Sequence, residues 1–135
     1  MSISYVDPAI VYLLQNKDLE ALKVGISSDA SKYDRVAHHE RYGWKLVHSW
    51  ALPTGAQAAA VELEILHWWR KDIGAPVALT EKDMPQGGFT ETISHLHVGI
   101  GQTLDRIDKA VTAAREKPQS ELPSVDEAER LLDDG

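Results

Sequence analysis

The chain of 135 residues contains no cysteine. Disulfide bonds and thiolate zinc sites are therefore excluded. No apolar run in the sequence approaches the ~20 residues that a membrane-spanning helix needs, and the first residues do not have the basic and then apolar layout of a signal peptide. We therefore expect a cytoplasmic protein that has no membrane partner.

The chain also lacks an excess of basic residues. It has 14 Lys and Arg against 21 Asp and Glu, which gives a net charge of −7. Because non-specific affinity for nucleic acid comes mainly from neutralising phosphates, this balance argues against a strong general nucleic-acid binder. Residues 118–135 carry a net charge of −5, which leaves −2 on the remaining 117 residues. Binding to DNA should therefore be modest and sensitive to salt.

The remaining composition, 43% apolar and 26% charged residues, is that of an ordinary globular domain. The pattern of apolar residues predicts a β-hairpin of strands 9–15 and 21–27, a helix between Ser31 and Gly43, and a third strand over residues 44–50. Thr54 and Gln57 form the sequence signature of a capping box, which predicts that a second helix begins there and runs to about Asp72.

The C-terminal part has the pattern of a long helix. Apolar side chains recur at helical spacing from Ile93 to Ala114, and Pro118 should end the helix. We expect an α+β fold, with a small three-stranded, mainly antiparallel sheet flanked by helices. The expected organisation is a domain over residues 1–93, a C-terminal amphipathic helix over 94–117 packed on it, and an acidic, flexible tail over 118–135. Two alternatives remain open: the helix could form a homodimer, and the tail could bind a basic partner.

Four reactive side chains occur at fixed offsets near the start of the chain. Tyr12 lies in an apolar run, Lys23 follows 11 residues later, and Arg35 precedes His39 by one helical turn. Residues four apart lie on one face of a helix. Arginine and lysine neutralise phosphate, and a phenol or an imidazole can handle the proton of a nucleophile. The set predicts a phosphodiester site, although Lys23 could instead be a charge that protects an edge strand.

The order and spacing of these residues resemble the GIY-YIG nuclease superfamily. Ile10-Val11-Tyr12 stands in the place of the GIY triad. Lys23-Val24-Gly25 stands in the place of YIG, and is similar to the Lys-Ile-Gly of a phage and bacterial branch. The stretch from Val61 to Leu66 resembles the helix with the metal-binding glutamate. Residues Gly87 to Thr92 resemble the short Gly-Glu-aromatic element that closes the domain in that branch.

This resemblance implies a divalent-metal-dependent DNA endonuclease or nicking enzyme that uses Mg²⁺ or Mn²⁺. Glu62 aligns with the metal ligand of the family, and Glu64 is the alternative. Two residues apart on a helix, these two glutamates face in different directions. A single carboxylate is compatible with Mg²⁺, which takes its other ligands from water and phosphate.

The resemblance also implies roles for the remaining residues. Arg35 would grip the phosphate oxygens, and Tyr12 would act as general base or position water, with its pKa lowered by Lys23 and the metal. His39 is the alternative base. Because Lys23 replaces the YIG tyrosine, a non-catalytic nucleic-acid-binding module and a protein-interaction module remain alternatives on the same scaffold.

Overall fold

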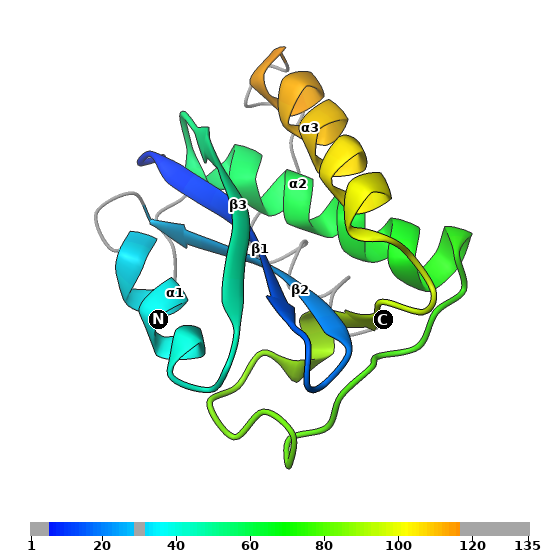
Figure 1. The fold of residues 1–135 in the computed structure, drawn as a ribbon. Helices are drawn as coiled ribbons and strands as arrows, with labels where there is room; N and C mark the ends of the chain where they lie inside the picture. The colour runs from blue at the N-terminus through cyan, green and yellow to red at the C-terminus, as the bar shows by residue number, and fades with distance from the viewer. Residues whose placement is uncertain (1–5, 29–31, 117–135) are drawn as a thin grey trace.

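A computed structural model describes residues 6–28 and 32–116 of the chain (Figure 1). The elements are, in chain order, β1 (Ala9–Asn16), β2 (Ala21–Ser28), α1 (Lys32–Glu40), β3 (Lys45–Leu52), α2 (Gly55–His67), a π-helical turn η2 (Trp68–Asp72), a 3₁₀ turn η3 (Phe89–Glu91), β4 (Thr92–Ser94) and α3 (Ile100–Glu116). The N-cap predicted at Ser31 and the acidic tail predicted over 118–135 lie outside the described residues.

The sheet has four antiparallel strands in the order β3-β1-β2-β4. The α+β class is confirmed, but the prediction of three strands was wrong. The fourth strand is only three residues long, and it pairs with β2 so that Thr92 lies opposite Lys23. This short strand therefore brings the residues just before it next to Lys23.

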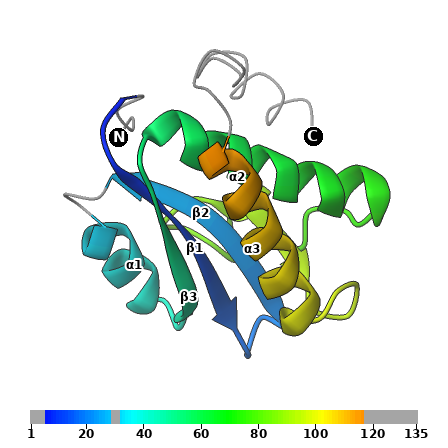
Figure 2. The same ribbon diagram turned by 90° about the horizontal axis from the view of Figure 1, so that it is seen from above.

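The helices lie on both faces of the sheet. Figure 2 shows α1 on one side of the strands and α2 with α3 on the other. The larger core lies between the sheet and α2 and α3. Its buried residues include Val11, Leu13, Leu22, Val24, Val61, Ile65, Trp69, Ile107 and Val111. A smaller core lies on the α1 side. It contains Ile10, Tyr12, Leu14, Ala21, Val36, Trp44, Leu79 and Met84.

Local sequence signals explain where the helices begin and end. Thr54 accepts a hydrogen bond from the backbone N–H of Gln57 at 3.2 Å, which confirms the predicted cap of α2. The turn after α1 contains Gly43 with a φ of +91°, the left-handed conformation expected at that position. Beyond His67 the helix continues as the π-helical turn to Asp72, so the predicted end of this helical segment is confirmed.

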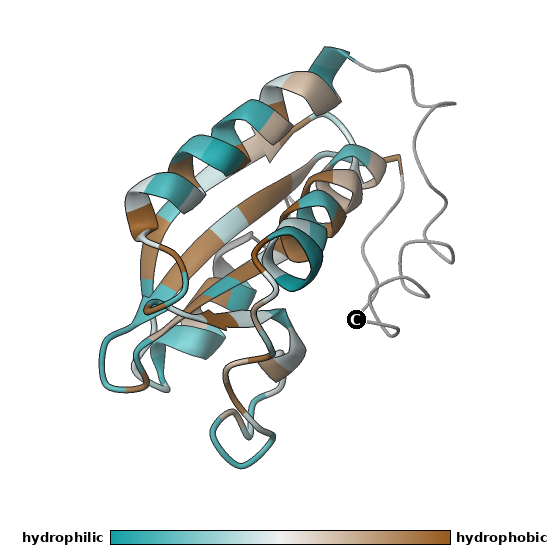
Figure 3. Ribbon diagram, turned by 90° about the vertical axis from the view of Figure 1, so that its right-hand side faces the viewer, coloured by the Kyte–Doolittle hydropathy of each residue, from teal (hydrophilic) through white to brown (hydrophobic). Residues whose placement is uncertain are grey.

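The C-terminal helix is shorter than predicted. Ile93 belongs to β4, and α3 begins only at Ile100. Ile107, Val111 and Ala114 pack into the larger core, so the apolar stripe of α3 is buried within its own domain. A homodimer through this helix would have to use its other faces, whose exposed residues are mostly polar and are coloured teal in Figure 3. In the part of the chain described here, no helix has the length and apolar character needed to cross a membrane.

Candidate functional site

Tyr12 of β1 lies at the centre of the face covered by α1, and only 1% of its surface is exposed. Its ring lies directly over Gly25, the residue paired with it on β2. A Cβ atom at position 25 would clash with the Cζ and Oη atoms of Tyr12. The glycine is therefore required here because the tyrosine ring occupies the space of its missing side chain.

Lys23 of β2 is buried on the same face and forms an ion pair with Glu91. The Lys23 Nζ atom lies 2.8 Å from Glu91 Oε2, 3.3 Å from the carbonyl oxygen of Val24, and 5.5 Å from the centre of the Tyr12 ring. Burial is the largest single influence on the pKa of Lys23 and lowers it. The charge of Glu91, the neighbouring Tyr12 and Glu62, and the hydrogen bond to Glu91 together outweigh burial and hold the pKa above its ordinary value. Lys23 is therefore a permanent cation in the site.

Glu62 enters the site from α2 and is 5% exposed. Burial raises its pKa to about 8, and the negative charge of Glu91 adds to this, while Lys23 and Arg35 oppose it. Within the described residues, Glu62 forms no hydrogen bond or ion pair. Glu64, by contrast, is exposed on the other side of the helix. The structure therefore brings Glu62, and not Glu64, to the other predicted residues.

Arg35 and His39 lie one turn apart on α1, as predicted. Arg35 is half-buried, and its Nη1 donates a hydrogen bond to the carbonyl oxygen of Ile26 at 3.2 Å. Its charge influences the pKa values of Tyr12, His39 and Glu62. The guanidinium group therefore adds a second positive charge to the cluster, at its solvent-exposed edge.

His39 is buried beside Tyr12, with 6.4 Å between the ring centres. Burial lowers its pKa to about 3, and the positive charge of Lys23 contributes, so the imidazole is neutral. The amide Nε2 of Gln86 lies 3.3 Å from His39 Nδ1. If the amide donates to Nδ1, the ring proton sits on Nε2, and His39 can then donate a hydrogen bond but cannot accept a proton there.

The pKa of Tyr12 is raised in this structure, whereas the prediction was that Lys23 and a bound metal together lower it. Lys23 and Arg35 lower that pKa, but burial has the largest influence and raises it above its ordinary value, and Glu91 and Glu62 add to the rise. Tyr12 is therefore a neutral phenol that can donate a hydrogen bond. The sequence could not show that its ring lies beneath α1 and the loop before η3.

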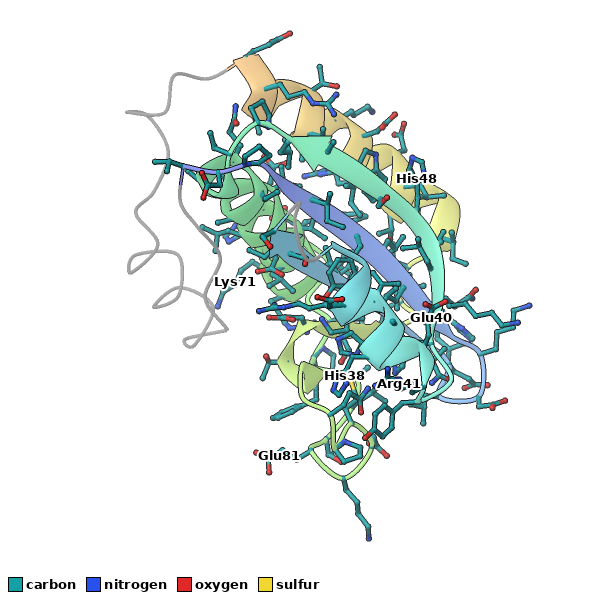
Figure 4. All side chains as sticks on the ribbon, turned by 90° about the vertical axis from the view of Figure 1, so that its left-hand side faces the viewer. His38, Glu40, Arg41, His48, Lys71 and Glu81 are labelled. Carbon is teal, nitrogen blue, oxygen red and sulfur yellow. The ribbon has the colours of Figure 1, made fainter. Side chains whose placement is uncertain are left out.

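That loop covers the cluster. Gly88 has a φ of +90°, and a Cβ atom there would clash with Lys23 Cε and lie 3.6 Å from His39 Cε1. Leu79 and Met84 anchor the same loop in the smaller core. Figure 4 shows α1, with His38 and Arg41 near its C-terminal end, above the loop that carries Glu81. The backbone at Gly88 therefore closes the site over Lys23 and His39.

The structure thus brings all five predicted residues into one cluster of interacting charges: Tyr12, Lys23, Arg35, His39 and Glu62. Sequence reasoning missed Glu91, which pairs with Lys23, and Gln86, which pairs with His39. The stretch Gly87 to Thr92 was singled out, but no role was given to Glu91. Its position depends on the pairing of β4 with β2.

The residues present fit a divalent cation in one respect. No group of three or more histidine and carboxylate side chains suited to a metal ion occurs among the described residues. Mg²⁺, however, is commonly held by one or two carboxylates, and waters and substrate phosphate complete its shell. Glu62 is a largely buried carboxylate with no hydrogen bond or ion pair within the described residues, but its oxygens are not among the fully buried atoms that lack a partner, so they keep some contact with solvent. Such a group is costly to bury unless something binds it.

Comparison with known proteins gave no match: no family model, no curated protein and no solved structure is similar to this chain.

Proposed function

We propose that this chain is a divalent-metal-dependent phosphodiesterase of GIY-YIG type that cleaves or nicks DNA. The observation that carries the proposal is Glu62, a buried carboxylate with no partner among the described residues, beside the cations Lys23 and Arg35 and the phenol of Tyr12. A carboxylate, two cations and a hydroxyl donor are together the groups needed to bind a metal and a phosphodiester.

Each residue has a role that follows from its chemistry, and Glu62 would release its proton when the cation binds. Glu62 would hold Mg²⁺ or Mn²⁺, and the bound cation would neutralise the phosphate and stabilise the leaving oxygen. Arg35, which lies at the exposed side of the cluster, would bind phosphate oxygens with its planar fork. Tyr12 and His39 are both neutral and would orient water or phosphate by donating hydrogen bonds.

One observation favours a second candidate, a nucleic-acid-binding module without catalysis. Tyr12, Lys23 and Glu62 are each at most 5% exposed, so a phosphodiester cannot reach them without movement of the loop at Gly88. A binding module would use the outer surface and would not need a metal. The net charge of −7 makes either form of DNA binding sensitive to salt.

A nicking assay on supercoiled plasmid tests the proposal. Wild-type protein should nick DNA only with Mg²⁺ or Mn²⁺, and Glu62→Ala should abolish the activity. Glu64→Ala is the matched control on the exposed side of the same helix and should keep it. Nicking that survives in Glu62→Ala would remove the metal role of Glu62. DNA binding without nicking, unaffected by metal, would favour the binding module.

A further inference from the structure

A row of aromatic rings leads from the candidate site to the surface. The ring centre of buried Tyr12 lies 6.4 Å from that of buried His39. The His38 ring lies 6.0 Å from the His39 ring, and the Tyr42 ring lies 5.8 Å from the His38 ring. His38 and Tyr42 are both exposed. These two outer rings are therefore a surface extension of the buried cluster.

The backbone fixes Tyr42 while its ring remains in solvent. Its N–H donates to the carbonyl oxygen of His39 at 2.9 Å, and its carbonyl oxygen accepts a hydrogen bond from Asn16 Nδ2 at 3.3 Å. The ring contacts the His38 ring at an interplanar angle of 67°, and 47% of the residue is exposed. A ring that is anchored in this way can bind a flat ligand with little loss of conformational entropy.

The charges around these rings suit a nucleic acid. Arg41 and Lys45 stand on either side of Tyr42 in the chain, and both are exposed. Neither has an ion-pair partner among the described residues, and Glu40 is the one acidic residue in this stretch. Figure 4 places His38 and Arg41 at the C-terminal end of α1. An aromatic ring beside cations is the combination that binds single strands, since bases stack on the ring and phosphates meet the cations.

We propose that His38 and Tyr42 form a stacking platform for an unpaired base, and that Arg41 contacts the phosphate next to that base. This rests on the function proposed above, since DNA is the ligand, and it specifies the class of substrate as DNA with unpaired bases. In a duplex the bases stack on one another, so they cannot lie on a surface ring unless they leave the helix.

The alternative is that Tyr42 only covers His38 and the turn after α1. The experiment that separates the two measures binding of the metal-free full chain to labelled oligothymidine by fluorescence anisotropy at low salt. The comparison is an abasic oligonucleotide of the same length, which keeps the phosphates but has no base to stack. Wild type should prefer oligothymidine by roughly five- to hundredfold, the range that one base stacked on an aromatic ring contributes.

Three kinds of variant assign this preference to the ring. Tyr42→Ala should weaken binding of oligothymidine by roughly fivefold or more and leave binding of the abasic strand unchanged, whereas Tyr42→Phe keeps the ring and should bind as wild type does. Arg41→Ala should weaken both strands alike, because it removes a phosphate contact. Leu96→Ala removes another exposed apolar side chain, which is 80% exposed on the turn between β4 and α3, and should have no effect. Urea unfolding of each variant checks that the fold is intact.

The outcomes separate this platform from the proposed function. Wild-type affinity of Tyr42→Ala for oligothymidine would overturn the platform. An equal loss for both strands would do so too, because the ring would then not act on a base. Failure of wild type to bind oligothymidine, or to prefer it to the abasic strand, also overturns the platform. In each case the plasmid assay decides separately whether the metal-dependent function stands, since nicking does not depend on these affinities being different.

Discussion

The buried carboxylate of Glu62 makes a specific prediction about stability and pH. Its pKa is about 8 in the folded protein and 4.5 as an ordinary side chain. Between these values the folded state holds a proton that the unfolded state has released. The contribution of this proton to the free energy of unfolding is therefore complete below about pH 4.5 and is lost as the pH rises through 8. Glu62→Gln, which cannot ionise, should abolish this loss.

The magnitude follows from the linkage relation. One proton held only by the folded state changes the free energy of unfolding by about 1.4 kcal/mol per pH unit. From pH 6 to pH 8, wild type should therefore lose roughly 2 kcal/mol relative to Glu62→Gln, as an order of magnitude. Saturating Mg²⁺ should reverse the loss at pH 8, since a ligand that binds only the folded state stabilises it.

Urea unfolding at several pH values, followed by the fluorescence of the buried Trp44 and Trp69, measures this difference. The quantity to plot is the free energy of unfolding of wild type minus that of Glu62→Gln, at each pH. Glu64→Gln is the control on the exposed side of the helix. A difference that stays flat from pH 5 to pH 9 would show that Glu62 is solvated and ionised throughout. Glu62 would then not be a largely buried carboxylate, and a metal at this position would lose its main support.

Four further predictions follow from the site. His39→Gln should remove a loss of stability that wild type shows as the pH falls from about 6.5 toward 3, because the folded state keeps the imidazole neutral; acid unfolding curves measure this. Gly25→Ala should destabilise the fold by about 1–3 kcal/mol through its clash with Tyr12, and Tyr12→Leu should relieve most of that cost in a double-mutant cycle of urea unfolding. Arg35→Lys should lose most nicking activity in the plasmid assay, because the charge remains but the planar fork is lost. Deleting residues 118–135 should strengthen DNA binding at low salt, and the gain should shrink near physiological salt in binding titrations at two salt concentrations.

The elements that could be predicted from sequence are those with a long local signal. The hairpin of β1 and β2 follows from two apolar runs around a polar turn, and the start of α2 follows from the Thr54 cap. The fourth strand could not be predicted, because three residues carry too little periodicity. Ile93 also fitted the helical spacing of the residues after it. The predicted helix therefore began at residue 94, which belongs to β4 and lies six residues before the start of α3.

The composition of the candidate site was predictable, but its electrostatics were not. Tyr12, Lys23, Arg35 and His39 could be grouped because they lie on adjacent elements of the first forty residues. The choice between Glu62 and Glu64 depended on which side of α2 is buried, and that depends on tertiary packing. The raised pKa of Tyr12 could not be predicted for the same reason, since burial has the largest influence on it and cannot be read from the local sequence.

The pairing of the charged groups in the cluster supports a bound ligand. It is stronger support than the mere presence of these charges. A cluster built only for stability would pair each buried ion with an opposite charge. Here Lys23 pairs with Glu91, and Arg35 donates to the backbone of Ile26, while Glu62 has no partner among the described residues. At neutral pH this carboxylate either holds a proton or is ionised in a largely buried setting, and either state is less favourable than it is in water. A bound cation would remove that cost, and this supports the metal-dependent function proposed above.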